Sequence, residues 1–221
     1  MAQVISAVQE KGGAGKSTMI SCIAGLMENE GVKTLIIDTD NQSSAANWAN
    51  KGDLQNVDVI RSTDADKLRG TIELFDDKYD VILIDTAGFG NDVNSRAIVL
   101  SDLILIPAGH NESTMERAAK AYRGAEDLTM DRKRPAEIRL VLWNVKTNTA
   151  VFKACKAFID AKGMKYVDYA VPSLVGFENM TFNGGLPDGR AASAIREFLG
   201  ALQIEGLLNY NKTELKEVSN G

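Results

Sequence analysis

The stretch Gln9–Thr18, QEKGGAGKST, follows a short apolar run and precedes a segment with helical spacing. A phosphate-binding loop lies between a strand and a helix and reads glycine, four residues, then Gly-Lys-Ser or Gly-Lys-Thr. Counting back from the GKS triplet, the first glycine position holds Glu10, and an additional lysine, Lys11, comes next. A plain glycine turn needs neither Lys16 nor Ser17, so the stretch predicts a phosphate loop in spite of Glu10.

The residue types of this loop suit a nucleotide. Glycines let successive backbone N–H groups turn around anionic oxygens, and the N-terminus of the following helix adds a favourable dipole. Lys16 is predicted to bridge the β- and γ-phosphates, and the Ser17 hydroxyl to ligate Mg²⁺. The loop alone therefore predicts a site for a nucleoside triphosphate with its metal ion.

The composition is that of an ordinary globular protein. The chain has 221 residues, of which 44% are hydrophobic and 25% charged, so we expect one domain, residues 1–221, with a polar tail from about 209 that frays. The net charge of −5 excludes a dedicated polyanion binder, and contact with nucleic acid requires a local basic patch. Two distant cysteines and one histidine argue against a disulfide framework or a metal cluster and favour a cytoplasmic setting. No signal peptide or run of ~20 apolar residues is present, so we expect no membrane segment.

Short β-rich apolar runs alternate with amphipathic segments along the chain. Runs such as LIID and VILID are apolar on both faces, which is typical of parallel strands covered by helices. The alternation predicts an α/β fold, a three-layer sandwich with a mostly parallel sheet of about seven to eight strands and helices on both faces. The predicted strands are Val4–Val8, Thr34–Asp38, Val57–Arg61, Val81–Asp85, Leu103–Pro107, Leu140–Val145 and Tyr166–Val171, and the helices include Thr18–Asn29, Ala65–Phe75, Glu112–Leu128 and Ala150–Ala161.

Carboxylates follow two of these strands. Asp38 and Asp40 end the second predicted strand, and Asp85 ends the fourth. Ligands of open α/β sheets bind at the carboxyl ends of the strands, where such carboxylates can hold Mg²⁺ and orient water. Taken alone, Asp38 and Asp40 are better explained by a solvated strand end with an Asx-turn, and a single aspartate such as Asp85 at the end of a strand is weak evidence for a site. Their order after the phosphate loop favours a composite site.

Three motifs together resemble the ParA/MinD group of P-loop ATPases. KGGAGKST resembles the deviant Walker A box of that group, DTDNQ its Walker A′ box and VILIDTAG its Walker B element. Ser101–Pro107 and the later VPSLVGFENMTFNGGLP are similar to further segments of the group. The resemblance extends from Val4 to about Leu208 and implies the P-loop NTPase fold of the deviant Walker A class.

The resemblance assigns roles to individual residues. It implies that Lys11 reaches across an ATP-sandwich homodimer to the nucleotide of the partner subunit, and that Asp40 positions the hydrolytic water. Lys11, Lys16 and Asp40 are thus the expected catalytic residues, with Ser17, Asp38 and Asp85 at the metal. The residues expected to contact ATP or ADP are Lys11, Gly12, Gly13, Ala14, Gly15, Lys16, Ser17, Thr18, Asn144 and Pro172. An exposed surface lysine is the alternative for Lys11, and a simple turn former for Asn144.

The resemblance also implies a biological role. The short plasmid-partition members of the group bind non-specific DNA as ATP dimers, associate with the nucleoid, and are released when a ParB-like adaptor stimulates slow, Mg²⁺-dependent hydrolysis. We expect Arg190 and Arg196 to contact DNA, although a solvated surface explains either arginine equally well. The alternative is a MinD-like or other P-loop ATP-dependent enzyme or regulator that does not bind DNA.

The sequence departs from the family pattern at two places. Asn41 replaces a proline in the Walker A′ box, and Thr86-Ala87-Gly88 replaces the commoner Thr-Pro-Pro. The chain starts at the first strand, without the N-terminal DNA-binding extension of the long partition ATPases. Ser193–Leu208 has one arginine against two glutamates, so we expect a helix that covers the core rather than a membrane anchor. We therefore expect a short ParA-type protein.

Overall fold

Six parallel strands form one sheet among the residues that the computed structural model describes, which are 1–10, 12–40, 45, 57–87, 92–109, 111–183 and 186–210. The strand order is β3-β2-β4-β1-β5-β6. The strands are β1 (Gln3–Ala7), β2 (Thr34–Asp38), β3 (Asp58–Arg61), β4 (Val81–Asp85), β5 (Leu103–Ala108) and β6 (Glu137–Leu142). The predicted α/β fold with a parallel sheet is confirmed.

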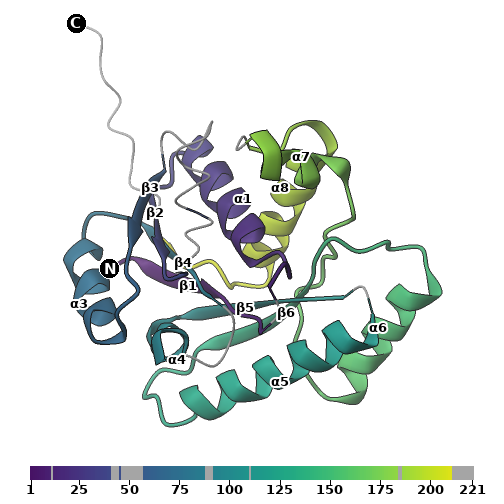
Figure 1. Cartoon of the computed structure of the whole chain (residues 1–221), viewed down its shortest axis with the longest axis horizontal. Helices are drawn as coiled ribbons and strands as arrows, with labels where there is room; N and C mark the ends of the chain where they lie inside the picture. Colours follow the sequence, from purple (N-terminus) through teal and green to yellow (C-terminus); the bar gives the residue numbers. More distant parts are fainter. Residues whose placement is uncertain are drawn as a thin grey trace, which may run out of the picture.

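Helices cover both faces of the sheet, as Figure 1 shows. Helices α1 (Lys16–Asn29), α7 (Val175–Asn183) and α8 (Gly189–Ile204) pack on one face. The opposite face is covered by α3 (Ala65–Phe75), α4 (Asp92–Leu100), α5 (Glu112–Thr129) and α6 (Ala150–Ala161). The three predicted layers are therefore present.

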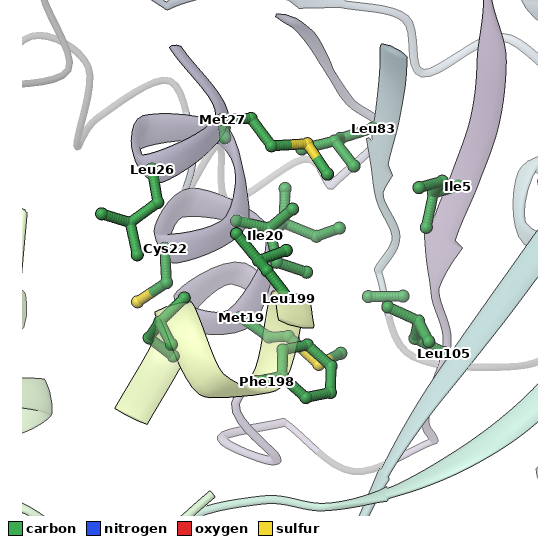
Figure 2. Close-up of a cluster of buried hydrophobic side chains, with 14 of the residues drawn as sticks. Ile5, Met19, Ile20, Cys22, Leu26, Met27, Leu83, Leu105, Phe198 and Leu199 are labelled. Atoms are coloured by element: carbon green, nitrogen blue, oxygen red, sulfur yellow. The ribbon is translucent and has the colours of Figure 1, made fainter. Parts of the chain in front are cut away.

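The alternation of side chains along each strand builds the two cores. Ile36 and Leu83 point toward α1, whereas their neighbours Ile37 and Ile84 point toward α3 and α4. All four side chains are fully buried, which explains why the strands read as continuous apolar runs. Figure 2 shows the core beneath α1, in which Phe198 of α8 is fully buried.

Several helices begin at side chains that cap their first turn. The carboxylate of Asp64 accepts a hydrogen bond from the N–H of Asp66 at the start of α3. Asn111 and Thr114 form a reciprocal capping box at α5, and the Thr149 hydroxyl accepts from the N–H of Phe152 at α6. Because each cap satisfies backbone donors that have no partner within the helix, these starts are locally encoded.

The Tyr166–Val171 run is not a full strand, contrary to the sequence prediction. It lies beside β6, but the pairing there is limited to two isolated bridges, Leu140 with Tyr166 in the run and Val145 with Pro172 directly after it. The Leu140 carbonyl accepts from the N–H of Val167 and the Leu142 carbonyl accepts from that of Val171. From Val167 to Val171 the run advances by four residues, whereas the paired carbonyls on β6 advance by only two. The extra residues interrupt the ladder.

Candidate nucleotide-binding site

The carboxyl ends of three neighbouring strands meet at one edge of the sheet. Ala7 of β1 is paired in register with Asp85 of β4, and Asp85 is paired with Asp38 of β2. The phosphate loop follows β1 directly, and α1 begins at Lys16. The fold therefore places the predicted loop beside two of the predicted carboxylates, at the edge where open α/β sheets bind ligands.

The loop has a backbone that glycine alone adopts readily. Gly13 has φ +75° and Gly15, the N-cap residue of α1, has φ +91°, a left-handed conformation that costs other residues roughly 1–2 kcal/mol. The Gly15 carbonyl accepts the N–H of Met19 and starts the helix. Gly12, Gly13 and Ala14 precede the helix, and Thr18 lies in its first turn. The loop therefore has glycines where a phosphate cradle needs them.

Lys16 is a buried cation that faces carboxylates. The residue is 8% exposed, and burial lowers the pKa of the ammonium, while Asp85 and Asp40 oppose this change. The two carboxylates therefore favour the protonated, charged form of Lys16 in this buried position. An ammonium at the first residue of a helix, next to a glycine loop, is suited to contact phosphate oxygens.

Asp85 is fully buried, and neither carboxylate oxygen has a hydrogen-bond partner within the described structure. Burial raises the pKa of Asp85 to about 7, reinforced by Asp38 and Asp40 and opposed by the Ser17 hydroxyl and Lys16. Buried carboxylates are normally paired or coordinate a metal. A hydroxyl and a carboxylate that face each other form the oxygen-rich donor set that Mg²⁺ prefers, so these residues fit the ion.

Asp38 and Asp40 form the Asx-turn that the sequence allows, but Asp38 lies in the buried site. The Asp38 carboxylate accepts the backbone N–H of Asp40 at 3.0 Å, which is the Asx arrangement. Asp38 is nevertheless fully buried, so it does not lie at a solvated strand end. Thr39 supports the same region, because its N–H and its hydroxyl both donate to the Asp85 carbonyl at 2.9 and 3.0 Å. The carboxylates are thus held by adjacent strands.

Two residues at the start of the loop connect it to its surroundings, and sequence reasoning gave them no role. The buried Gln9 amide donates to the Pro107 carbonyl at 3.0 Å, and its oxygen accepts the N–H of Glu10 at 2.8 Å. Glu10, at the position of the missing glycine, forms an ion pair of 2.7 Å with Lys120 of α5. The signal in the sequence was a polar residue directly after a strand predicted to be buried. The departure from the glycine pattern therefore has a structural use.

Asn144 and Pro172, the predicted base contacts, line different hollows. Asn144 has φ +54° and lines a cavity of about 260 Å³ at the end of β6, together with Ser173, Thr149 and Cys155. Pro172 instead lines a groove of about 790 Å³. Asn144 thus lies in a cavity with polar lining groups, and Pro172 is not among the residues that line this cavity.

The predicted DNA contacts lie along the same groove as Pro172. Arg190 and Arg196 are exposed on α8 and both line it. Asp188 and Glu197 line it as well, so the groove has mixed charge. The predicted catalytic residue Lys11 lies outside the described residues, as do Asn41 and Gly88 of the two departures from the family pattern.

Comparisons with known proteins agree with this geometry. Residues 5–102 match the CobQ/CobB/MinD/ParA nucleotide binding domain. The protein ParA of Rhizobium radiobacter is 25% identical over 168 residues, which cover 75% of this chain and 76% of that protein. The family match at residues 5–102 includes the loop and all three carboxylates, and the resemblance to the ParA/MinD group is confirmed.

Solved structures share the fold. A putative plasmid partition protein of Borrelia burgdorferi bound to AMPPNP superposes with a TM-score of 0.74 at 20% identity, covering 94% of this chain and 99% of that chain. The septum site-determining protein MinD of Pyrococcus horikoshii complexed with Mg-ADP gives a TM-score of 0.71 at 19% identity, covering 94% and 97%. At these identities the likeness extends to the fold alone. Within the part of the chain that the structure describes, no helix is both long and apolar enough to cross a membrane.

Proposed function

Because residues 5–102 match the CobQ/CobB/MinD/ParA nucleotide binding domain, we propose that the chain is a slow, Mg²⁺-dependent ATPase. We further propose that it acts as a cytoplasmic, nucleoid-associated partition or cargo-positioning protein. The observation that carries the proposal is the convergence of Lys16, Asp85 and Asp38 at adjoining strand ends, next to a loop with left-handed glycines. The relatives named ParA and plasmid partition protein support the biological role.

Different residues of the site have different proposed roles in hydrolysis. Backbone N–H groups of Gly13–Ser17 and the ammonium of Lys16 bind the phosphates. Ser17 and Asp85, with Asp38 next to them, would hold Mg²⁺, which when bound offsets the negative charge of the phosphates. Asp40 orients the attacking water by accepting one of its protons in a hydrogen bond. None of the described residues at the site is a histidine or another strong base, which is consistent with slow turnover.

Dimerisation would make ATP binding a switch. Lys11 is proposed to contact the phosphates bound by a second copy, so that two nucleotides join two chains. The dimer then presents two α8 helices, and the arginines Arg190 and Arg196 on each contact non-specific DNA. Two weak patches that act together bind far more tightly than one, which would make DNA binding depend on ATP. Hydrolysis, stimulated by a ParB-like adaptor, would release the DNA.

The decisive experiment measures DNA binding in three nucleotide states. Binding of a non-specific duplex is compared with ATP, with ADP and with no nucleotide, at two salt concentrations. The proposal expects tight binding with ATP only, weakened by salt. Equal binding in all three states contradicts the switch. MgATP turnover without DNA binding in any state would instead favour a MinD-like regulator.

Variants test the individual roles. Arg190→Ala and Arg196→Ala should weaken DNA binding without changing turnover, whereas Arg69→Ala, an exposed arginine of α3, is the matched control. Asp40→Ala should trap an ATP-bound dimer with little turnover. Lys11→Ala should abolish the ATP-dependent dimer, and Lys133→Ala, at an exposed position away from the loop, controls for the loss of one lysine. A Lys11→Ala protein that still dimerises with ATP removes the contact with the partner subunit from the proposal.

A further inference from the structure

The side chain of Trp143 contacts the phosphate loop. A Cβ atom placed on Gly15 would lie 2.7 Å from both Cδ1 and Nε1 of Trp143, so the indole rests against the backbone of Gly15. At Gly12 and Gly13 the same construction meets no atom within 4 Å. Among these three loop glycines, Gly15 alone is therefore supported by a side chain from a distant part of the sequence.

The residue that carries the indole is itself held in place. Trp143 follows β6 and is 3% exposed, and its backbone N–H donates to the Ala108 carbonyl at 3.0 Å. At the next residue the chain turns, because Asn144 has φ +54°. A Cβ on the neighbouring Gly109 would lie 2.5 Å from Cγ1 of Val145, so no larger residue fits beside this turn. Trp143 thus presents a fixed, flat surface to the loop.

The same indole contacts two helices that lie beyond the loop. Its ring centre is 5.6 Å from that of Phe177 in α7, at 40°, and 6.1 Å from that of Phe198 in α8, at 77°. Both distances are within the range of attractive aromatic pairs. Figure 2 shows Phe198 beside Met19 of α1, the residue whose N–H is bonded to the Gly15 carbonyl. An aromatic cluster of Trp143, Phe177 and Phe198 therefore joins the loop to α7 and α8.

We propose that Trp143 is a positioning residue of the nucleotide site: it holds Gly15, and with it the backbone donors of the loop, in the phosphate-binding arrangement. The inference rests on the proposed nucleotide site. A glycine-rich loop without side-chain support samples many conformations, and a ligand that must order it binds more weakly. Because the indole already orders the loop in the nucleotide-free protein, nucleotide binding does not have to supply the conformational entropy of ordering it. Through the cluster, the position of the loop is also linked to the helix that carries Arg190 and Arg196.

Affinity measurements on variants test the positioning role. Trp143→Leu keeps an apolar side chain but loses the flat contact, and we expect the Kd for ATP to rise about tenfold or more. Trp143→Phe should restore most of the affinity. In both variants kcat at saturating ATP should stay within about twofold of the original value, because the residue orders the loop without touching the reacting atoms. Leu68→Ala, in the core under α3 and away from the loop, controls for a general loss of stability.

The results separate the inference from the function on which it rests. If wild-type protein binds ATP but Trp143→Leu binds it equally well, Trp143 has no positioning role. The positioning role is equally excluded if Leu68→Ala weakens binding by the same factor. If the wild-type protein binds no nucleotide, the proposed site itself is wrong, and this inference fails with it.

Fluorescence tests the contact without disturbing it. The chain has two tryptophans, so Trp48→Phe leaves Trp143 as the single emitter. A buried indole against the loop must respond to the charge of arriving phosphates, because the field is weakly screened there. We expect its emission to change on addition of MgATP, with the midpoint at the Kd found by calorimetry. Unchanged emission at saturating ATP overturns the proposed contact.

Discussion

Replacing Asp85 by asparagine should stabilise the metal-free protein, and increasingly so as the pH rises. Burial, with help from Asp38 and Asp40, raises the pKa of Asp85 to about 7 from an ordinary value of 3.8. The folded state therefore resists ionisation of this carboxyl, whereas the unfolded chain does not. At about 1.4 kcal/mol for each pH unit between the two pKa values, the cost approaches about 4 kcal/mol at high pH.

The sign and the pH window follow from linkage. Because the folded-state pKa is raised, the stability that the protonated carboxyl contributes is complete below about pH 4 and is lost as the pH rises toward about 7. Asparagine has a similar size and does not titrate. Between about pH 5 and pH 8, the free energy of unfolding of Asp85→Asn, relative to the wild type, should rise by roughly 2 to 3 kcal/mol.

Urea denaturation in EDTA without nucleotide, repeated across this pH range, measures the difference. Asp131→Asn, at an exposed position, controls for the loss of one negative charge. The reasoning would be refuted if the free energies of unfolding of Asp85→Asn and wild type differed by the same amount at every pH from 5 to 8. With MgATP the order should reverse, because only the wild type keeps the carboxylate that fits the metal ion, and ligand binding adds to its stability.

Two further predictions concern packing and the cysteines. Gly25→Ala in α1 should lower the free energy of unfolding by about 1 kcal/mol, because overlap with Leu186 outweighs the gain of about 1 kcal/mol in helix propensity. Gly70→Ala in α3, where no atom lies within 4 Å, should raise the same free energy by about 1 kcal/mol in the same urea assay, and a shared sign would contradict the packing argument. Burial raises the pKa of the Cys22 thiol, and Cys22 is fully buried, so it should not react with a thiol reagent at pH 8 until the protein unfolds. Rapid modification of Cys22 in the native protein would show that this thiol is accessible.

The sequence anticipated the elements with a strong local signal. The ranges of β2, β4, α3 and α6 agree with the sequence prediction, because continuous apolar runs and capped amphipathic segments specify strands and helices locally. The Tyr166–Val171 run has the same apolar character but is not a full strand. Its pairing depends on the register against β6, which no local pattern encodes.

Within the candidate site, the amino-acid sequence alone determined which residues belong together, because glycines, a lysine and carboxylates at consecutive strand ends suit only a few chemistries. Only the tertiary structure decided how they meet. The strand order sets Asp38 and Asp85 side by side, and burial among like charges raises the pKa of Asp85. The contact of Trp143 with Gly15 has the same origin: it joins the end of the last strand to the loop after the first. Such long-range contacts arise from the packing of whole elements, which local periodicity does not report.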